Sequence, residues 1–136
     1  MIEGKDYVDT VKKYYSFLNT EFNMSITDER VRGNAFYDIQ YGDRTKIISI
    51  NYENIEDYFQ VTIFKLQNGK MPDYDDKTKT LHLNKLNVAV ISRVDRSEFS
   101  LNNKYFAKFN AKDELERKLL KSAKELRLCL KHLSEL

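Results

Sequence analysis

The chain has 136 residues, of which 41% are apolar and 32% charged, a balance typical of a soluble protein with a single core. Its formal net charge of +2 is too small to indicate a nucleic-acid partner. A single cysteine excludes an internal disulfide, and the sequence shows neither an apolar run of about 20 residues nor a signal peptide. These features predict one cytoplasmic domain over residues 1–136 that has no membrane partner.

Residues 7–22 are predicted to form an amphipathic helix. Tyr7, Val11, Tyr14, Leu18 and Phe22 recur at steps of three and four, which places them on one helical face. Acidic residues gather near the start, where the helix dipole favours negative charge. One stripe of this helix is therefore expected to be buried and the other exposed.

Residues 26–63 are predicted to form an antiparallel meander of three to four strands. Apolar and polar residues alternate over residues 35–41, 48–52 and 59–63, which is the period of a half-buried strand. Residues 26–31 form a further candidate strand. The short links between these segments favour antiparallel pairing, because parallel strands need long crossovers. Pro72 cannot donate to a strand ladder, so residues 69–80 are expected to form an exposed loop.

The last third of the chain is predicted to be mainly helical. Residues 83–94 fit one helical face, although residues 88–91 would also suit a strand. Residues 96–103 are expected to be irregular, and a longer helix is expected to follow Asn110 as its N-cap. The sequence therefore predicts an α+β fold with an N-terminal helix, a meander, and C-terminal helices packed on the sheet.

The terminal helix has two interpretations. A heptad pattern over three repeats, at the lower limit for a coiled coil, is formed by Leu115, Leu119, Ser122, Leu126, Cys129, Leu133 and Leu136. Leu120, Ala123 and Leu130 widen this stripe, which favours packing within the chain. Homodimerisation through the helix stays open as the alternative.

Charge and tyrosine content bear on the kind of partner. From Lys104 onward the chain holds nine Lys/Arg and five Asp/Glu, whereas the preceding residues hold fourteen and sixteen. Nine tyrosines are more than a small core needs, so several are expected at the surface. Surface tyrosine suits protein recognition, although strands also collect it without any function.

The sequence contains no motif for nucleophilic or zinc chemistry. The only histidines are His82 and His132. Cys129 lies in an apolar helical stripe, so a catalytic Cys129–His132 pair is not expected, because a reactive thiol needs access and a lowered pKa. One cysteine and two distant histidines do not suffice for a zinc site.

Calcium and phosphate sites are not expected either. Asp73 and Asp75 start like a calcium-binding loop, but Lys77, Thr78 and Asn84 occupy positions that need a ligand, a glycine and a glutamate. The glycine-rich phosphate-binding motifs are absent. The sequence therefore predicts no cofactor, no metal and no catalytic residue.

The middle of the chain combines Ile- and Tyr-rich strand segments with an acidic loop. Residues 47–53 read IISINYE and residues 58–66 read YFQVTIFKL. With the preceding helix, this order resembles small uncharacterised bacterial α+β proteins of immunity-protein type, over residues 7–86. Some proteins of that type neutralise a toxin. The resemblance implies a small α+β fold and binding without catalysis.

These observations predict a non-catalytic protein-binding module, with an immunity-type inhibitor of a toxin as its specific form. An acidic, Tyr-rich surface would meet a basic protein, and complementary charge speeds association. The predicted binding residues are Tyr52, Tyr58, Asp73, Tyr74, Asp75 and Asp76. The alternative is a small-molecule-binding or enzymatic domain, whose pocket between sheet and helices would gather polar residues such as His82, Tyr37 and Glu53.

Overall fold

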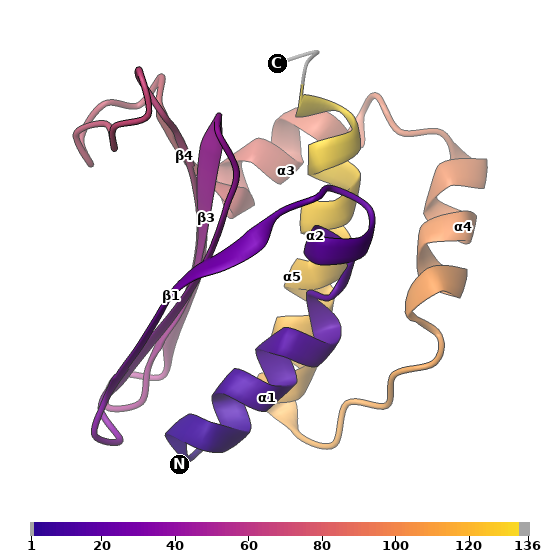
Figure 1. The fold of residues 1–136 in the computed structure, drawn as a ribbon. Coiled ribbons are helices and arrows are strands. Elements are labelled where there is room, and N and C mark those ends of the chain that lie inside the picture. The colour runs from indigo at the N-terminus through magenta and orange to yellow at the C-terminus, as the bar shows by residue number, and fades with distance from the viewer. Residues whose placement is uncertain (1, 134–136) are drawn as a thin grey trace. The chain divides into compact units, whose positions relative to one another are not determined.

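The computed structural model describes residues 2–133 and confirms the α+β class (Figure 1). Within this range the chain forms five helices and five strands. It divides into two compact units, the first ending at His82 and the second beginning at Leu83. The first unit holds two helices and the whole sheet, and the second holds three helices. The single domain expected over residues 1–136 stays a prediction.

Two N-terminal helices, α1 (Gly4–Tyr14) and α2 (Phe17–Thr20), replace the single helix expected over residues 7–22. The amphipathic prediction is confirmed in α1, whose buried residues include Tyr7 and Val11. Regular helix ends at Tyr14, whereas the apolar spacing continues beyond it. Periodicity alone therefore could not locate the break.

The strands form one antiparallel sheet in the order of the sequence: β1 (Ser25–Arg32), β2 (Phe36–Gly42), β3 (Lys46–Glu53), β4 (Tyr58–Lys65) and β5 (Thr80–His82). The predicted meander is confirmed, with five strands where three to four were expected. The additional strand, β5, lies at the end of the expected loop and pairs with residues 62–64 of β4. Three residues are too few to show an alternating pattern, so this strand could not be predicted from the sequence.

The two faces of the sheet have different surroundings within the first unit. α1 lies along one of them, which we call the inner face (Figure 1). There Tyr7 stacks on Tyr37 with ring centroids 5.2 Å apart, and its hydroxyl donates to the backbone oxygen of Ile50 at 2.9 Å. Residues that pair across neighbouring strands project to the same face. Tyr37 and its cross-strand partners lie on the inner face. The residues between them along each strand project to the opposite side, which we call the outer face.

The second unit contains α3 (Leu83–Ile91), α4 (Arg96–Phe106) and α5 (Glu114–Lys131), and both α3 and α4 contact α5. The helices expected around α3 and α5 are confirmed. α4 corrects the expectation that residues 96–103 are irregular. Its N-cap, Asp95, accepts a hydrogen bond from the backbone N–H of Glu98, which stabilises the first turn.

α5 begins slightly later than expected. Asp113 rather than Asn110 is its N-cap, and its side chain accepts a hydrogen bond from the backbone N–H of Glu116 at 2.8 Å. Residues 126–130 are all buried, which is wider than the seam of a coiled coil. Homodimerisation through α5 stays a prediction that a mass measurement in solution would test. Leu136, the last heptad position, lies outside the described residues.

Candidate functional site

The six predicted binding residues do not share one surface. Tyr58 and Tyr74 are 54% and 58% exposed, but Tyr52 is only 6% exposed. The ring of Tyr52 lies on the inner face, 6.0 Å from that of Tyr7, and its hydroxyl donates to Asp57 Oδ1 at 2.6 Å. Tyr52 is therefore a core residue. Its ring is on the inner face, so a protein that binds the outer face would not contact it.

Most tyrosines of this chain build its core. Six of the nine are buried: Tyr7, Tyr14, Tyr15, Tyr37, Tyr41 and Tyr52. Several of their hydroxyls reach partners inside the fold; that of Tyr37, for example, donates to the backbone oxygen of Ile2 at 2.8 Å. A satisfied hydroxyl removes most of the penalty of burying tyrosine. The expected surface tyrosines reduce to two with large exposure, Tyr58 and Tyr74.

Three of the predicted residues, Asp73, Asp75 and Asp76, flank Tyr74 in the segment between β4 and β5. Hydrogen bonds from the Thr78 hydroxyl and backbone N–H, at 2.6 and 3.0 Å, lower the pKa of Asp76. The Tyr74 ring lies 6.4 Å from that of Phe64 and 5.6 Å from that of His82.

Both of these rings belong to the outer face. The segment therefore folds over one end of that face, as its trace beside the sheet shows (Figure 1).

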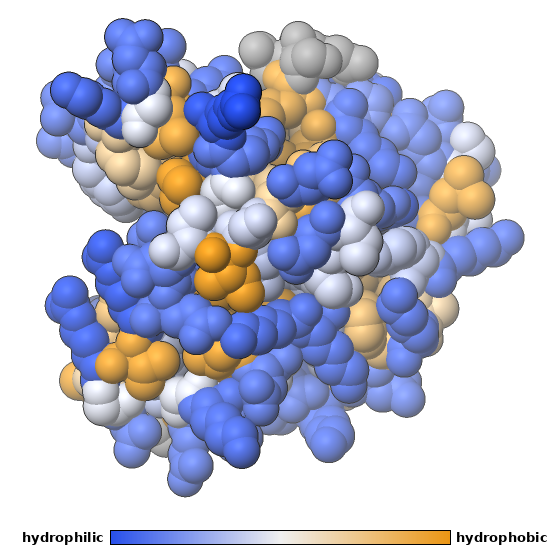
Figure 2. Space-filling view, in the orientation of Figure 1, coloured by the Kyte–Doolittle hydropathy of each residue, from blue (hydrophilic) through white to orange (hydrophobic). Residues whose placement is uncertain are grey.

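The outer face carries aromatic residues at both ends. Phe36, Glu53 and Tyr58 form the row at one end, and Phe64 lies at the other, against Tyr74. Tyr58 and Phe64 are six residues apart on β4, or about 20 Å at the usual rise of a strand. Tyr58 and Tyr74 therefore mark opposite ends of one face. In the same orientation as Figure 1, Figure 2 shows blue, hydrophilic residues over most of the visible surface.

Polar side chains fill the middle of the outer face in two cross-strand rows, which we call the polar rows: Asp28, Gln40, Ser49, Thr62 and His82 in one, and Arg30, Asp38, Asn51 and Gln60 in the other. The carboxylate of Asp38 accepts hydrogen bonds from Ser49 Oγ at 2.6 Å and from Gln40 Nε2 at 2.8 Å. Gln60 Nε2 lies 2.8 Å from His82 Nδ1. These rows largely satisfy their own hydrogen bonds.

The residues of the alternative pocket do not converge. Tyr37 projects to the inner face, whereas Glu53 and His82 lie on the outer face. His82 lies in the same cross-strand row as Ser49 of β3. Glu53 is four residues further along β3 than Ser49, and β3 is two strand spacings from β5, which holds His82. These three side chains therefore do not form one site.

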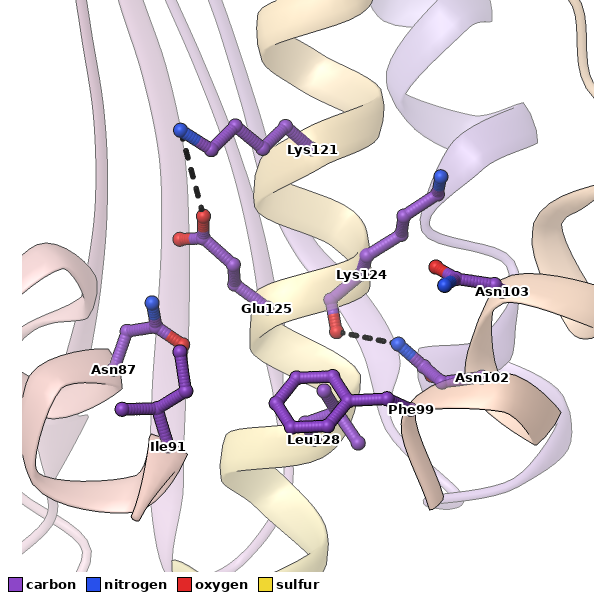
Figure 3. A pocket seen from close by; sticks show the side chains of 9 residues that line it. All are labelled: Asn87, Ile91, Phe99, Asn102, Asn103, Lys121, Lys124, Glu125 and Leu128. Atoms are coloured by element: carbon purple, nitrogen blue, oxygen red, sulfur yellow. Dashed lines mark hydrogen bonds and ion pairs between the residues drawn. The ribbon is translucent and has the colours of Figure 1, made fainter. Parts of the chain in front are cut away.

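A different pocket lies entirely within the second unit (Figure 3). Its volume is about 210 Å³, and its lining comes from three helices: Asn87 and Ile91 of α3, Phe99, Asn102 and Asn103 of α4, and Lys121, Lys124, Glu125 and Leu128 of α5. The spacings of three and four residues place each helix's contribution on one of its faces. No sequence signal marked this pocket, because it depends on which helical faces meet.

The polar groups of this pocket have few partners. Glu125 Oε1 lies 4.0 Å from Lys121 Nζ. Burial raises the pKa of Glu125, and the charge of Lys121 opposes this shift. The side chains of Asn87, Asn103 and Lys124 form no hydrogen bond or ion pair within residues 2–133. Their hydrogen-bonding capacity faces solvent or a ligand.

Cys129 and His132 do not form a reactive pair. Burial and the charge of Glu125 raise the pKa of the Cys129 thiol to about 12, so that it is protonated at neutral pH. His132 Nε2 lies 2.7 Å from Glu98 Oε2. Within residues 2–133, no group of three or more His, Cys, Asp or Glu side chains could hold a metal ion. None of the described helices is long and apolar enough to cross a membrane.

Comparison with known proteins found no match, neither to a family model nor to a curated protein nor to a solved structure. The resemblance to immunity-type proteins therefore stays a prediction.

Proposed function

We propose that this protein is a non-catalytic protein-binding module whose outer face meets a basic partner protein. The observation that carries the proposal is the pair of exposed tyrosines, Tyr58 and Tyr74, at opposite ends of that face. Tyrosine combines a large apolar ring with a polar tip and is enriched among the residues that dominate interface energies. Tyr58 and Phe64, the ring that Tyr74 contacts, are about 20 Å apart along β4, and anchors at the two ends of such a strand suit a protein surface better than a small molecule.

Carboxylates surround both tyrosines. Glu53 pairs with Tyr58 across the strands, and Glu56 and Asp57 lie just before it in the chain.

Three aspartates flank Tyr74 in the same way, although Lys77 and Lys79 follow them and reduce the excess of negative charge there. Residues 1–82 as a whole hold 11 Lys/Arg and 14 Asp/Glu, a net charge of −3. A basic partner would complement this charge, which speeds association more than it raises affinity.

The polar rows between the tyrosines support binding rather than catalysis. Asp38 is 6% exposed and accepts two side-chain hydrogen bonds. His82 Nδ1 is engaged by Gln60 and lies 3.3 Å from the Thr62 hydroxyl. A general acid or base must reach the proton that it transfers, whereas the Asp38 carboxylate and the Nδ1 atom of His82 are already engaged by their neighbours.

A narrower form of the proposal is that the partner is a toxin that this chain neutralises. Its support is the resemblance over residues 7–86 together with the negative charge of residues 1–82. A toxin-encoding reading frame beside the gene would favour it. Co-expression should then restore the growth of cells that produce the toxin. If the toxin kills equally with and without this chain, the narrower form is wrong.

Site-specific photo-crosslinking tests the binding face. A benzophenone amino acid placed at position 58 or at position 74 should capture the same partner in the source cells. The matched control is position 88, because Val88 is 73% exposed but belongs to the second unit. Capture of one partner from positions 58 and 74 alone supports the proposal. Equal capture from all three positions, or capture of unrelated proteins from 58 and 74, contradicts it.

A further inference from the structure

We propose that the pocket of the second unit binds a free aliphatic α-amino acid of the size of leucine. The floor of the pocket is the α5 face formed by Lys121, Lys124, Glu125 and Leu128, and α3 and α4 supply its walls (Figure 3). All of these residues belong to the second unit. The inference is therefore independent of the binding function proposed for the sheet.

The size of the pocket limits its ligand. A cavity of about 150 Å³ holds benzene, which has six carbon atoms. By proportion, the 210 Å³ of this pocket accommodates about eight or nine non-hydrogen atoms, and leucine has nine. Pockets that bind drug-sized ligands and cofactors have volumes of about 300 Å³ or more. The pocket is therefore too small for a nucleotide and suits a small metabolite.

Opposite charges lie on the two sides of the pocket. Glu125 lies toward the α3 wall beside Asn87, whereas Lys124 lies toward the α4 wall beside Asn103 (Figure 3). An α-amino acid carries an ammonium and a carboxylate on adjacent carbons. Its ammonium would donate to Glu125, and its carboxylate would accept from Lys124, in charge-assisted hydrogen bonds. Lys121 also lines the pocket, with its Nζ 4.0 Å from Glu125 Oε1. Because the Lys121 side chain is 80% exposed, the ammonium of the ligand can replace it beside Glu125.

The amide side chains fit the same ligand. Asn87 and Asn103 each offer an unengaged acceptor and donor within the described part of the chain. Asn102 is different, because its Nδ2 donates to the Lys124 backbone oxygen at 3.0 Å and its Oδ1 accepts from Arg127 at 2.8 Å. Asn102 therefore holds the wall in place, while the two free amides are open to the ligand.

The apolar lining selects the side chain of the ligand. Ile91, Phe99 and Leu128 supply the hydrophobic surface of the pocket. They would cover an aliphatic side chain, and burial of each CH₂ group strengthens binding by roughly fourfold. Glycine would forgo this contribution, and a charged side chain would be placed against apolar groups.

The ligand requirements can be tested on the intact protein by NMR titration, following the side-chain amide signals of Asn87 and Asn103. L-leucine should bind with a dissociation constant of about a millimolar or below. The comparison compounds each remove one contact: 4-methylpentanoate lacks the ammonium, leucinol lacks the carboxylate, and glycine lacks the side chain. Each should bind at least tenfold more weakly than leucine.

Two variants test the assignment of the charged groups. Glu125→Gln should abolish the preference for leucine over 4-methylpentanoate, and Lys124→Gln should abolish the preference for leucine over leucinol. Lys131→Gln is the matched control, because Lys131 is exposed on α5 outside the pocket. It should leave both preferences unchanged.

Several results would overturn the inference. They are the absence of saturable shifts for leucine and valine up to 10 mM, equal binding of leucine and 4-methylpentanoate, or preferences that persist in both variants. The ligand series uses the unaltered protein, so it decides the matter even if a variant fails to fold. If leucine does not bind, the proposed role of Tyr58 and Tyr74 is unaffected, because the crosslinking experiment tests that role separately.

Discussion

The polar rows of the sheet and the pocket of the helical unit both gather polar side chains, but they use them in opposite ways. Asp38 in the polar rows is 6% exposed and holds two hydrogen bonds from its neighbours. Lys124 in the pocket has no such partner among the described residues. Polar groups that satisfy one another stabilise a fold, whereas polar groups left open beside the apolar residues of a pocket are those that a ligand can engage.

The two regions also belong to parts of the chain with opposite charge. Residues 1–82 have a net charge of −3, whereas residues 83–136 hold 12 Lys/Arg and 7 Asp/Glu, a net charge of +5. The whole-chain value of +2 hides this division. Partners of different chemistry are therefore expected for the two regions.

Replacement of Asp38 should have the largest effect on stability. Asp38→Ala removes the acceptor of one buried and one partly buried hydrogen bond and leaves Ser49 without its partner, which should cost about 2–3 kcal/mol of unfolding free energy. Asn103→Ala, in the pocket, breaks no hydrogen bond within the described residues and should change stability by less than about 0.5 kcal/mol. Urea denaturation measures both. Equal losses would erase the distinction between the two regions.

Two buried tyrosines offer the same contrast inside the core. Tyr7→Phe removes a hydrogen bond to the Ile50 backbone oxygen and should destabilise the protein by about 1–1.5 kcal/mol. The Tyr41 hydroxyl is buried without a partner in the part of the chain that the structure describes, so Tyr41→Phe should be neutral or stabilising. Thermal and chemical unfolding of the two variants checks this. A larger loss in Tyr41→Phe would mean that Tyr41 has an unrecognised partner.

Asp43 gives a pH-dependent case at the β2–β3 turn. Partial burial alone would raise its pKa, but hydrogen bonds from Lys46 and Thr45 outweigh burial and lower it to about 2. A carboxyl group whose pKa is lowered on folding stabilises the folded state at pH values above its unfolded pKa of about 3.9. This contribution to stability is lost as the pH falls through the folded pKa of about 2. Asp43→Asn should therefore lose about 1 kcal/mol at pH 7. The difference in urea midpoint between Asp43→Asn and the parent protein should shrink as the pH approaches 2. A difference that does not change with pH would contradict a lowered pKa for Asp43.

Glu125 should show the smallest effect, with the opposite sign. Burial raises its pKa, so the ionised form is disfavoured in the folded state and the parent protein gains stability as the pH falls. Glu125→Gln should equal the parent or exceed it by a few tenths of a kcal/mol at pH 7, since the 4.0 Å pair with exposed Lys121 adds little. This advantage should vanish below about pH 4. A clear destabilisation at pH 7 would show that Glu125 has a structural role.

Local patterns allowed much of the fold to be predicted. Alternation over residues 35–63 indicated three strands of the meander, and the apolar steps from Tyr7 to Tyr14 indicated the buried face of α1. β5 escaped because three residues carry no period. α4 was missed because its signal was a single cap, Asp95, that stood in a segment with little apolar periodicity.

The candidate site was less predictable for a physical reason. Residue type does not determine exposure, since Tyr52 and Tyr58 have the same side chain but are 6% and 54% exposed. Strand register decides which face each occupies. The pocket depends on three helices meeting, and Lys124 appears in the sequence only as one lysine on a polar helical face.

The most direct test of the binding face is the affinity of the crosslinked partner for single variants, measured by calorimetry. Tyr58→Ala and Tyr74→Ala should each weaken binding at least tenfold, as expected for aromatic interface anchors, while the unfolding midpoint stays unchanged. Val88→Ala, an exposed residue of the second unit, should bind like the parent. If both tyrosine variants bind within twofold of the parent protein, the outer face is not the interface.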